Sequence, residues 1–318
     1  MAATAIANIV VPTIFSPYVV ERSTTLSNIL NSGIAQRSPV FDEMAGAKGK
    51  TFELPYFNDL TGADEVLADG SALTINNITA EQETATKFMR GKAWGATDLA
   101  SAVAGEDIMA SIGDMVAGYW ARSIQTTMMG IVDAMFTDAS GELWATHVVD
   151  NAATDITSSM VVDAMQKLGD NSDRLTTMVV HSATYAKLQK DSLIAFIRDA
   201  DNNIMFSTFL GKRLIVDDQC TTSGSGATTE YRSYLFGEGA FAYGVGSIDN
   251  ATEIDRDTLK GEDVLINRQH YILHPRGLKF VGSVAGSSPT NAEVSAGADW
   301  TQVWDNQNIK MVCLIAGV

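Results

Sequence analysis

The sequence predicts an α+β fold organised around one long helix. Between Gly105 and Phe136 the apolar residues recur at helical spacing, and no proline interrupts them. On both sides of this segment, short stretches alternate apolar and polar residues as β-strands do, with further helical stretches between them. The length of 318 residues fits two domains or one composite body with excursions.

Composition excludes some classes of function. A hydrophobic content of 46% is normal for a chain with a packed core. The formal net charge is −16, and Lys and Arg form no cluster along the sequence. Because binding to duplex nucleic acid depends on clustered basic residues, we expect no duplex-binding surface.

Cysteine use and hydropathy indicate neither a metal site nor a membrane segment. Cys220 and Cys313 are far apart and lack the spacing of metal ligands, so we expect two reduced, buried thiols and no cofactor. No apolar run approaches the ~18 residues of a membrane span, and the apolar N-terminus lacks the basic start of an export signal.

The segment from Gly105 to Phe136 is predicted to be one continuous helix of roughly 45 Å, buried on one stripe. The acidic residues after Gly105 suit a first helical turn, where backbone N–H groups are unpaired. Two neighbouring apolar rows form the expected stripe: Ile108, Ile112, Met115 and Tyr119 in one, and Val116, Trp120, Ile124, Met128, Ile131 and Met135 in the other.

The first 95 residues predict an arm followed by a thin hairpin. Residues 1–48 contain small residues and three prolines, with a short helical patch at 18–30, and their apolar content requires a surface to lie on. Residues 50–58 and 84–94 alternate as strands, and Pro55 places the first at an edge. The polar segment 59–82 joins them, so this hairpin lacks a core of its own and needs a partner surface.

After the long helix the sequence predicts alternating strands and helices. Two helices begin at capping residues: 158–168 after Thr157 or Ser158, and a second from Ser182 to about 188. The expected strands are 143–149, 178–180, 213–217, 231–244 with a Gly-broken middle, 264–273, 278–281 and 311–315. Residues 221–229 are expected as a loop, 249–263 as a charged excursion, and Pro275 with Gly277 as a turn.

Three groups of residues could carry chemistry. His181 and Ser182 with Asp217 could form a hydrolase site, but no Gly-x-Ser-x-Gly motif supports it, and a helix cap explains Ser182 as well. His270 and His274 have the four-residue spacing of metal ligands on a helix, yet their surroundings predict a strand. The glycine pairs at 237–239 and 244–246 precede no helix, so turns and close backbone approach explain them better than phosphate binding.

The order of arm, acidic hairpin, long helix, mixed domain and returning strand resembles the major capsid proteins of tailed double-stranded DNA phages, a fold shared with encapsulins and the herpesvirus capsid floor. The similarity extends over nearly the whole chain. The strings that carry it are Gly-Lys-Ala-Trp at 91–94, Val-His-Ser-Ala-Thr-Tyr-Ala-Lys-Leu at 180–188, Gly-Lys-Arg-Leu-Ile-Val-Asp-Asp at 211–218, Tyr-Leu-Phe-Gly at 234–237, His-Pro-Arg-Gly at 274–277 and Ser-Pro-Thr-Asn-Ala-Glu at 288–293.

The resemblance implies a tailed-phage major capsid fold with five parts. These are an N-terminal arm (1–48), an extended loop (49–95), a peripheral domain with the spine helix (96–155), an axial domain (156–263) and returning strands of the peripheral domain (264–318). It also implies a structural protein without enzymatic activity, whose copies form pentamers and hexamers of an icosahedral shell around phage DNA. Scaffolding, portal and decoration proteins would be separate partners, with assembly in the bacterial cytoplasm.

The extended loop supplies the candidate contacts between subunits. We expect its acidic segment to face basic residues of a neighbouring copy, while burial of aromatic side chains contributes more. The candidates are Phe57, Asp64, Glu65, Asp69, Lys87, Arg90, Lys92 and Trp94. Two alternatives stay open: an encapsulin-like compartment holding enzyme cargo, and a soluble hydrolase using His181, Ser182 and Asp217.

Overall fold

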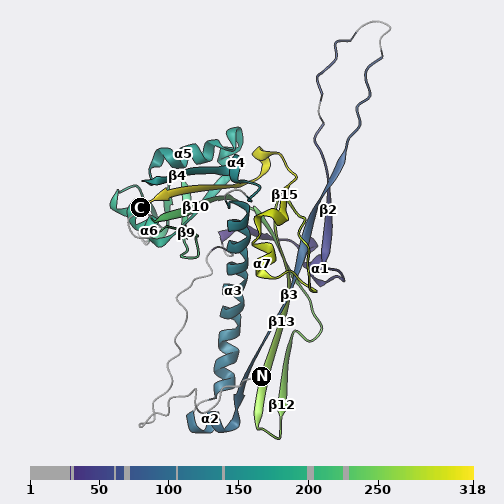
Figure 1. Ribbon diagram of the computed structural model, residues 1–318, viewed down its shortest axis with the longest axis vertical. Coiled ribbons are helices and arrows are strands. Elements are labelled where there is room, and N and C mark those ends of the chain that lie inside the picture. The colour runs from purple at the N-terminus through teal and green to yellow at the C-terminus, as the bar shows by residue number, and fades with distance from the viewer. Residues whose placement is uncertain are drawn as a thin grey trace.

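A long helix stands at the centre of the molecule, between a mixed helix–sheet body at one end and two hairpins that point in opposite directions (Figure 1). This is a computed structural model, which describes residues 29, 32–60, 62–67, 72–104, 107–137, 140–198, 204–224 and 229–318. The helical patch expected at 18–30 and most of the arm lie outside the described residues.

One strand, β3 (Ala80–Thr97), connects both hairpins. Its first residues pair antiparallel with β2 (Thr51–Phe57), and from Lys87 onward it pairs with β13 (Glu262–Pro275). The predicted strands on both sides of the loop are therefore confirmed, with β3 longer at each end. Pairing with β2 extends β3 at its start, and pairing with β13 extends it at its end beyond the reach of β2.

A six-stranded sheet forms around β3 and β13. Its order is β1 (Ala35–Arg37), β11 (Phe241–Gly246), β13, β3 and β2, and β12 (Thr252–Asp257) pairs with the free part of β13. Helix α1 (Pro39–Gly46) packs directly on β11. A Cβ at Gly244 or Gly246 would lie within about 2.4 Å of the α1 backbone. Close backbone approach is thus the reason for these glycines.

The predicted spine is confirmed as α3 (Ile108–Met135), which follows the short helix α2 (Asp98–Ala104). Asp107 caps α3, because its carboxylate accepts a hydrogen bond from the Ala110 N–H at 3.1 Å. Gly105 and Glu106 lie outside the described residues. Burial begins only at Trp120, so the expected stripe is wrong for the first three turns, where Ile112 is half-buried and Met115 is exposed.

The body contains an eight-stranded mixed sheet with two buried faces. Strand order is β4 (Val148–Asp155), β16 (Met311–Gly317), β10 (Glu230–Gly237), β5 (Leu175–Val180), β8 (Lys212–Val216), β7 (Ile204–Phe209) and β6 (Ala195–Arg198), with β9 (Thr222–Ser223) beside β10. The sheet thus includes β4 and β16, strands from both sides of the segment 156–263.

Alternate residues of this sheet belong to two different cores. Cys313 and Tyr234 face the second half of α3, whereas Val312 and Leu235 face α5 (Ser158–Gln166) and α6 (Ser182–Lys190). Burial on both faces explains the continuous apolar runs of these strands. The other elements are α4 (Trp144–His147), β14 (Leu278–Phe280), α7 (Asn291–Val294), β15 (Trp300–Gln302) and the 3₁₀ helices Gly169–Arg174, Gly297–Asp299 and Asn306–Asn308.

Five local predictions differ from the structure, one of them the loop expected at 221–229, where Thr222 and Ser223 form β9 against β10. The strand expected at 143–149 begins as α4 and becomes extended only at Val148. The segment 231–244 is two strands in separate sheets, because the chain turns at Gly239, whose φ is +67°. The excursion 249–263 is the β12–β13 hairpin, stabilised by pairing that charge content does not reveal. His181, rather than Ser182, caps α6.

A buried polar clasp fixes the base of the β2–β3 hairpin on the body. The Glu83 carboxylate lies 3.1 Å from His274 Nε2 and accepts a hydrogen bond from the Gly277 N–H, also at 3.1 Å. Both side chains are almost fully buried. Because an unpaired buried polar group costs free energy, this geometry is strongly preferred over other placements of the hairpin.

We predict that Ile124→Pro destabilises the subunit by about 3 kcal/mol or more, because it breaks α3 within its buried half. Soluble yield and urea unfolding measure the effect. Val116→Pro, in the half-buried first part of α3, is the comparison variant. Assembled particles of normal yield from Ile124→Pro would contradict the role of α3 as the structural centre.

Glu83→Ala should lower the free energy of unfolding by about 1.5–3 kcal/mol, because it leaves His274 and the Gly277 N–H without their acceptor. Urea unfolding of unassembled subunits measures this change. The matched control is Glu53→Ala, an exposed carboxylate on the paired strand β2, expected within about 0.5 kcal/mol of the parent. Equal effects of both variants would show that the clasp contributes nothing.

Candidate assembly surfaces

The distal part of the β2–β3 hairpin exposes many large apolar side chains. Val66 is 94% exposed, Ile75 90% and Phe57 73%. Between Asn58 and Thr79 the described residues form no strand, and the hairpin projects away from the body (Figure 1). Exposed apolar side chains beside unpaired backbone are typical of a segment that binds another protein surface. The others are Leu60, Leu67, Leu73 and Ile78.

The acidic candidates lie on this same segment. Glu65 accepts a hydrogen bond from the Thr74 N–H at 3.1 Å, which joins the two sides of the hairpin. Hydrogen bonds from Thr74 lower the pKa of Glu65, so it is ionised at neutral pH. Asp64 is exposed, and Asp69 lies outside the described residues. The segment therefore presents negative charge among apolar side chains.

The basic and aromatic candidates of β3 have different environments. Lys87 is buried, and its Nζ donates to the Ala47 carbonyl at 2.7 Å; burial lowers its pKa. Trp94 packs edge-to-face on Tyr119, with ring centroids 5.2 Å apart. Arg90 donates to the Asn291 side chain at 2.9 Å and lies over the Phe88 ring. Of these residues, Lys92 is the exposed cation.

A shallow hollow of about 380 Å³ lies on β3 and β13 and combines small and basic residues. Gly91 and Ala93 pair with Arg268 and Ile266, so the small side chains leave space beside the large ones. Sequence reasoning missed Arg268, although the alternation of the strand 264–273 places it on the face of Ile266 and His270. Burial of the imidazole lowers the pKa of His270, and the positive charge of Lys87 lowers it further.

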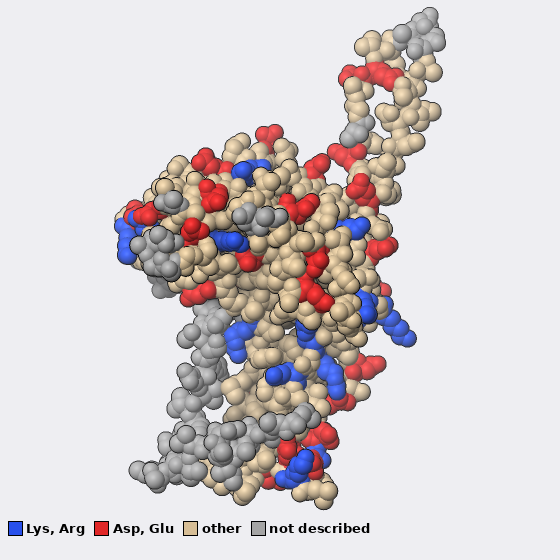
Figure 2. Space-filling model, in the orientation of Figure 1, with Lys and Arg blue, Asp and Glu red and all other residues tan. Residues whose placement is uncertain are grey.

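Lys and Arg side chains gather near the middle of the molecule in the view of Figure 2, while acidic residues lie over the body and the hairpin. This distribution separates charge within a chain of net charge −16. Arg268 is partly neutralised by an ion pair with Glu253 on β12. The hollow remains basic overall because Arg90 and Lys92 also line it.

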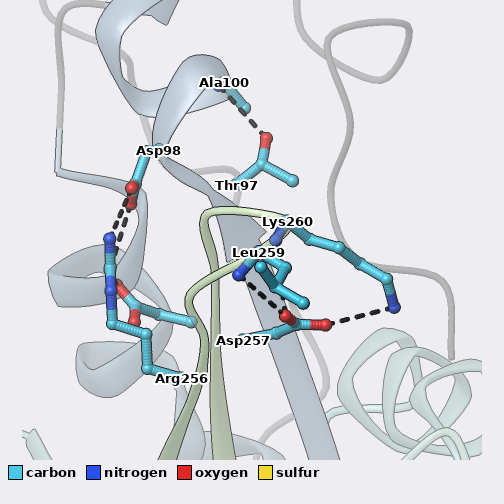
Figure 3. A network of polar contacts seen from close by, with 8 residues as sticks. Thr97, Asp98, Ala100, Arg256, Asp257, Leu259 and Lys260 are labelled. Atoms are coloured by element: carbon cyan, nitrogen blue, oxygen red, sulfur yellow. Dashed lines mark hydrogen bonds and ion pairs between the residues drawn. The ribbon is translucent and has the colours of Figure 1, made fainter.

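The β12–β13 hairpin is fastened to α2 by a polar network (Figure 3). Arg256 bridges Asp98 on α2 at 2.6 Å and Asp263 on β13 at 2.8 Å, and these hydrogen bonds raise its pKa. Asp257 accepts hydrogen bonds from the Leu259 and Lys260 N–H groups. The network thereby fixes a tight turn that leaves Leu259 97% exposed.

Among the described residues, the eight-stranded sheet of the body ends in an exposed strand. Strand β6 is the last strand of the eight-stranded sheet, and all four of its residues are exposed. Phe196 and Ile197 on β6 and Met205 on β7 add exposed apolar area. An exposed, apolar edge strand can add a strand from another chain.

The residues of the hydrolase alternative have structural roles instead. His181 Nδ1 accepts the Ala183 N–H at 3.0 Å, and Asp218 accepts the Ser182 N–H at 3.0 Å. Asp217 accepts from the Gln125 side chain at 2.5 Å, and burial raises its pKa. A triad requires an imidazole hydrogen-bonded to both hydroxyl and carboxylate. Here the imidazole Nδ1 is used by the helix cap.

The two histidines with the spacing of metal ligands lie in different environments. His270 lines the hollow on β3 and β13, whereas His274 is buried against Glu83. Among the described residues, no cluster of three His, Cys, Asp or Glu side chains could hold a metal ion. None of the described helices is long and apolar enough to span a membrane.

Comparisons with known proteins give one consistent result. The family model "Major capsid protein 13-like" (Gp13-like) matches residues 67–317. The major capsid protein of Bacillus phage SPP1 is 39% identical over 316 residues, covering 98% of each chain.

Solved structures similar to this chain include the capsid of cyanophage Pam1, with a TM-score of 0.63, 11% identity and coverage of 99% and 98%. The capsid of cyanophage P-SCSP1u has a TM-score of 0.61, 10% identity and coverage of 96% and 93%. At such low identity these two show the fold alone, and they confirm the predicted phage capsid fold. The family match and the SPP1 relative together place the chain in the Gp13-like family of major capsid proteins, a structural family and not an enzyme family.

Proposed function

We propose that many copies of this chain form the icosahedral shell of a tailed phage, joined as pentamers and hexamers around double-stranded DNA. The observation that carries the proposal is the projecting hairpin, whose large apolar side chains are left exposed by the described residues of their own subunit. The phage capsid protein relative and the capsid folds among similar structures support it.

In this proposal the five parts of the chain have distinct positions in the shell. The arm (1–48) and extended loop (49–95) reach neighbouring subunits, and the peripheral domain (96–155 and 264–318) contains the spine. Of the axial domain (156–263), the part that joins the eight-stranded sheet lies at the capsomer centre, where the exposed edge of β6 meets the next copy, whereas β11 and β12 pair with β13 in the other sheet. Strands β4 and β16 join its sheet and so connect the axial and peripheral parts rigidly.

The hairpin of one copy lies on the β3–β13 face of the next. Its ionised Glu65 and Asp64 would face the hollow lined by Arg90, Lys92 and Arg268. Exposed ion pairs contribute only about 0–1 kcal/mol each, whereas burying a large apolar side chain contributes about 1.5–3 kcal/mol. Affinity therefore comes mainly from Phe57 and its apolar neighbours, and the charges set orientation.

Charge and thiols fit the same proposal. A chain of net charge −16 offers packaged DNA a surface that binds phosphate weakly, which suits entry and release. Burial raises the pKa of both Cys220 and Cys313, as expected for unreactive thiols in a reducing bacterial cytoplasm where assembly takes place. Scaffolding, portal and decoration proteins are proposed as separate chains. In the virion, the chain is located in the capsid shell.

Limited proteolysis tests whether the hairpin is shared between subunits. Unassembled subunits should be cut between about Leu60 and Glu83, and assembled particles should be spared there, because a neighbour covers the segment. Mass spectrometry of the fragments locates the cuts. Equal cutting of the hairpin in both forms would overturn the proposed contact.

Phe57→Ala should reduce particle yield several-fold while changing subunit stability by less than about 0.5 kcal/mol, because the side chain is 73% exposed. Electron microscopy of particles and urea unfolding of subunits measure the two effects. Two further variants complete the series. Trp94→Ala should lower particle yield and also subunit stability, because it loses packing on Tyr119. Lys92→Ala should change particle yield least of the three. Normal yield from Phe57→Ala would contradict the apolar contact.

A further inference from the structure

A second hollow, of about 230 Å³, lies where four chain segments meet at the base of the hairpin. Gln36 of β1, Glu238 of the β10–β11 turn and Arg276 of the β13–β14 turn form part of its lining. Trp304, Asn308 and Lys310, between β15 and β16, form the rest. The hollow is separate from the β3–β13 face and from the distal hairpin.

Positive charge prevails in this hollow. Arg276 and Lys310 are both half-buried, and neither forms an ion pair with the described residues. Lys310 Nζ donates to the Glu238 backbone carbonyl at 3.2 Å, while the Arg276 guanidinium lies over the Phe41 ring at 5.2 Å. Glu238 is the one acidic residue of the lining and is exposed. Two cations therefore face one solvated carboxylate.

An unused donor belongs to the same lining. Trp304 Nε1 is buried and has no hydrogen-bond partner among the described residues. A buried N–H group without an acceptor is rare in folded proteins, and a bound ligand is one of its ordinary explanations. Asn308 and Gln36 add side-chain amides at the rim. The two cations and the indole and amide N–H donors outnumber the one carboxylate of the lining, and together they suit an anion with several acceptor oxygens.

We infer that this hollow is a carboxylate-binding site, formed chiefly by Arg276, Lys310 and the Trp304 indole. The guanidinium can bind a carboxylate through two parallel hydrogen bonds, and Lys310 supplies a second charge. The ligand is a carboxylate group, either of a free di- or tricarboxylate or of an acidic side chain on a second copy. The site assigns a binding role to residues outside the proposed assembly contacts.

A carboxylate bound at this site would restrain the β2–β3 hairpin. The Trp304 ring packs edge-to-face against Tyr56 of β2, with centroids 6.2 Å apart. The Tyr56 hydroxyl donates to the Val303 carbonyl at 2.9 Å. A carboxylate that fixes the Trp304 indole therefore also restrains the strand from which the hairpin extends. Binding and hairpin position are coupled through this one ring.

Citrate titration of purified full-length subunits tests the site. Citrate should raise Tm saturably above the value in sodium chloride of equal ionic strength. Lys310→Gln should weaken citrate binding about tenfold or more, because it removes a charged donor. Lys279→Gln on β14, outside the hollow, is the matched control and should bind as the parent does. Calorimetry gives the dissociation constants.

Trp304→Phe removes the indole N–H of the lining. Because it also loses part of the bicyclic ring that packs on the core and on Tyr56, Tm without citrate should fall, and citrate affinity of the folded subunit should fall several-fold. Arg276→Gln should lose binding too, although it also loses contact with Phe41. Absence of a saturable citrate effect on the parent, or full retention in both Lys310→Gln and Trp304→Phe, would overturn the inference.

Assembled particles distinguish the two sources of the carboxylate, and this arm alone rests on the proposed shell. If a second copy fills the site, particles bind no citrate and Lys310→Gln lowers particle yield. If the ligand is a free anion, particles and subunits bind citrate alike and the yield is unchanged. Failure of the proposed shell would abolish particles in every variant and leave the subunit titration interpretable.

Discussion

The structure depends on one strand that changes its partner halfway along. The ladder of β3 with β2 ends at Thr86, and its ladder with β13 begins at Lys87. At about 3.3 Å per residue, the 18 residues of β3 extend for roughly 60 Å as one continuous element. The projecting hairpin is therefore an extension of the same sheet that packs against the spine, and its direction is inherited from that sheet.

Polar groups, rather than apolar ones, fix the point where the partners change. Glu83, Lys87 and His274 are all buried there, and each has a hydrogen-bond partner in another segment of the chain. Apolar side chains could fill the same space in several arrangements, whereas buried polar groups tolerate few. The clasp thus specifies one orientation of the hairpin. The hollow around Trp304 lies near the same base, because the Trp304 ring contacts Tyr56 of β2.

Beyond this fixed centre, the described part of the subunit is incomplete at its extremities. The distal hairpin, the first three turns of α3, the β12–β13 turn and the edge of β6 all expose apolar or unpaired groups. Copies with a net charge of −16 repel one another at long range, so local pairing of acidic and basic surfaces is needed to orient them. Because these exposed edges need partner surfaces, they are the physical basis for the association of many copies into a shell.

The sequence by itself determined the elements whose signal is local. Helical periodicity predicted α3 with its start near Asp107, two-residue alternation predicted β2 and β3, and a continuous apolar run predicted the terminal strand, because these patterns reflect neighbouring residues. The candidate contacts from Phe57 to Trp94 followed from the same reasoning, but their environments did not.

Only the tertiary structure placed Lys87 against Ala47, joined Glu83 to His274 across 191 positions, and divided 231–244 between two sheets. It also showed that the first turns of α3 are not buried by the described residues of the chain. Those outcomes depend on which distant segments become neighbours, and a local pattern of residues does not encode that choice.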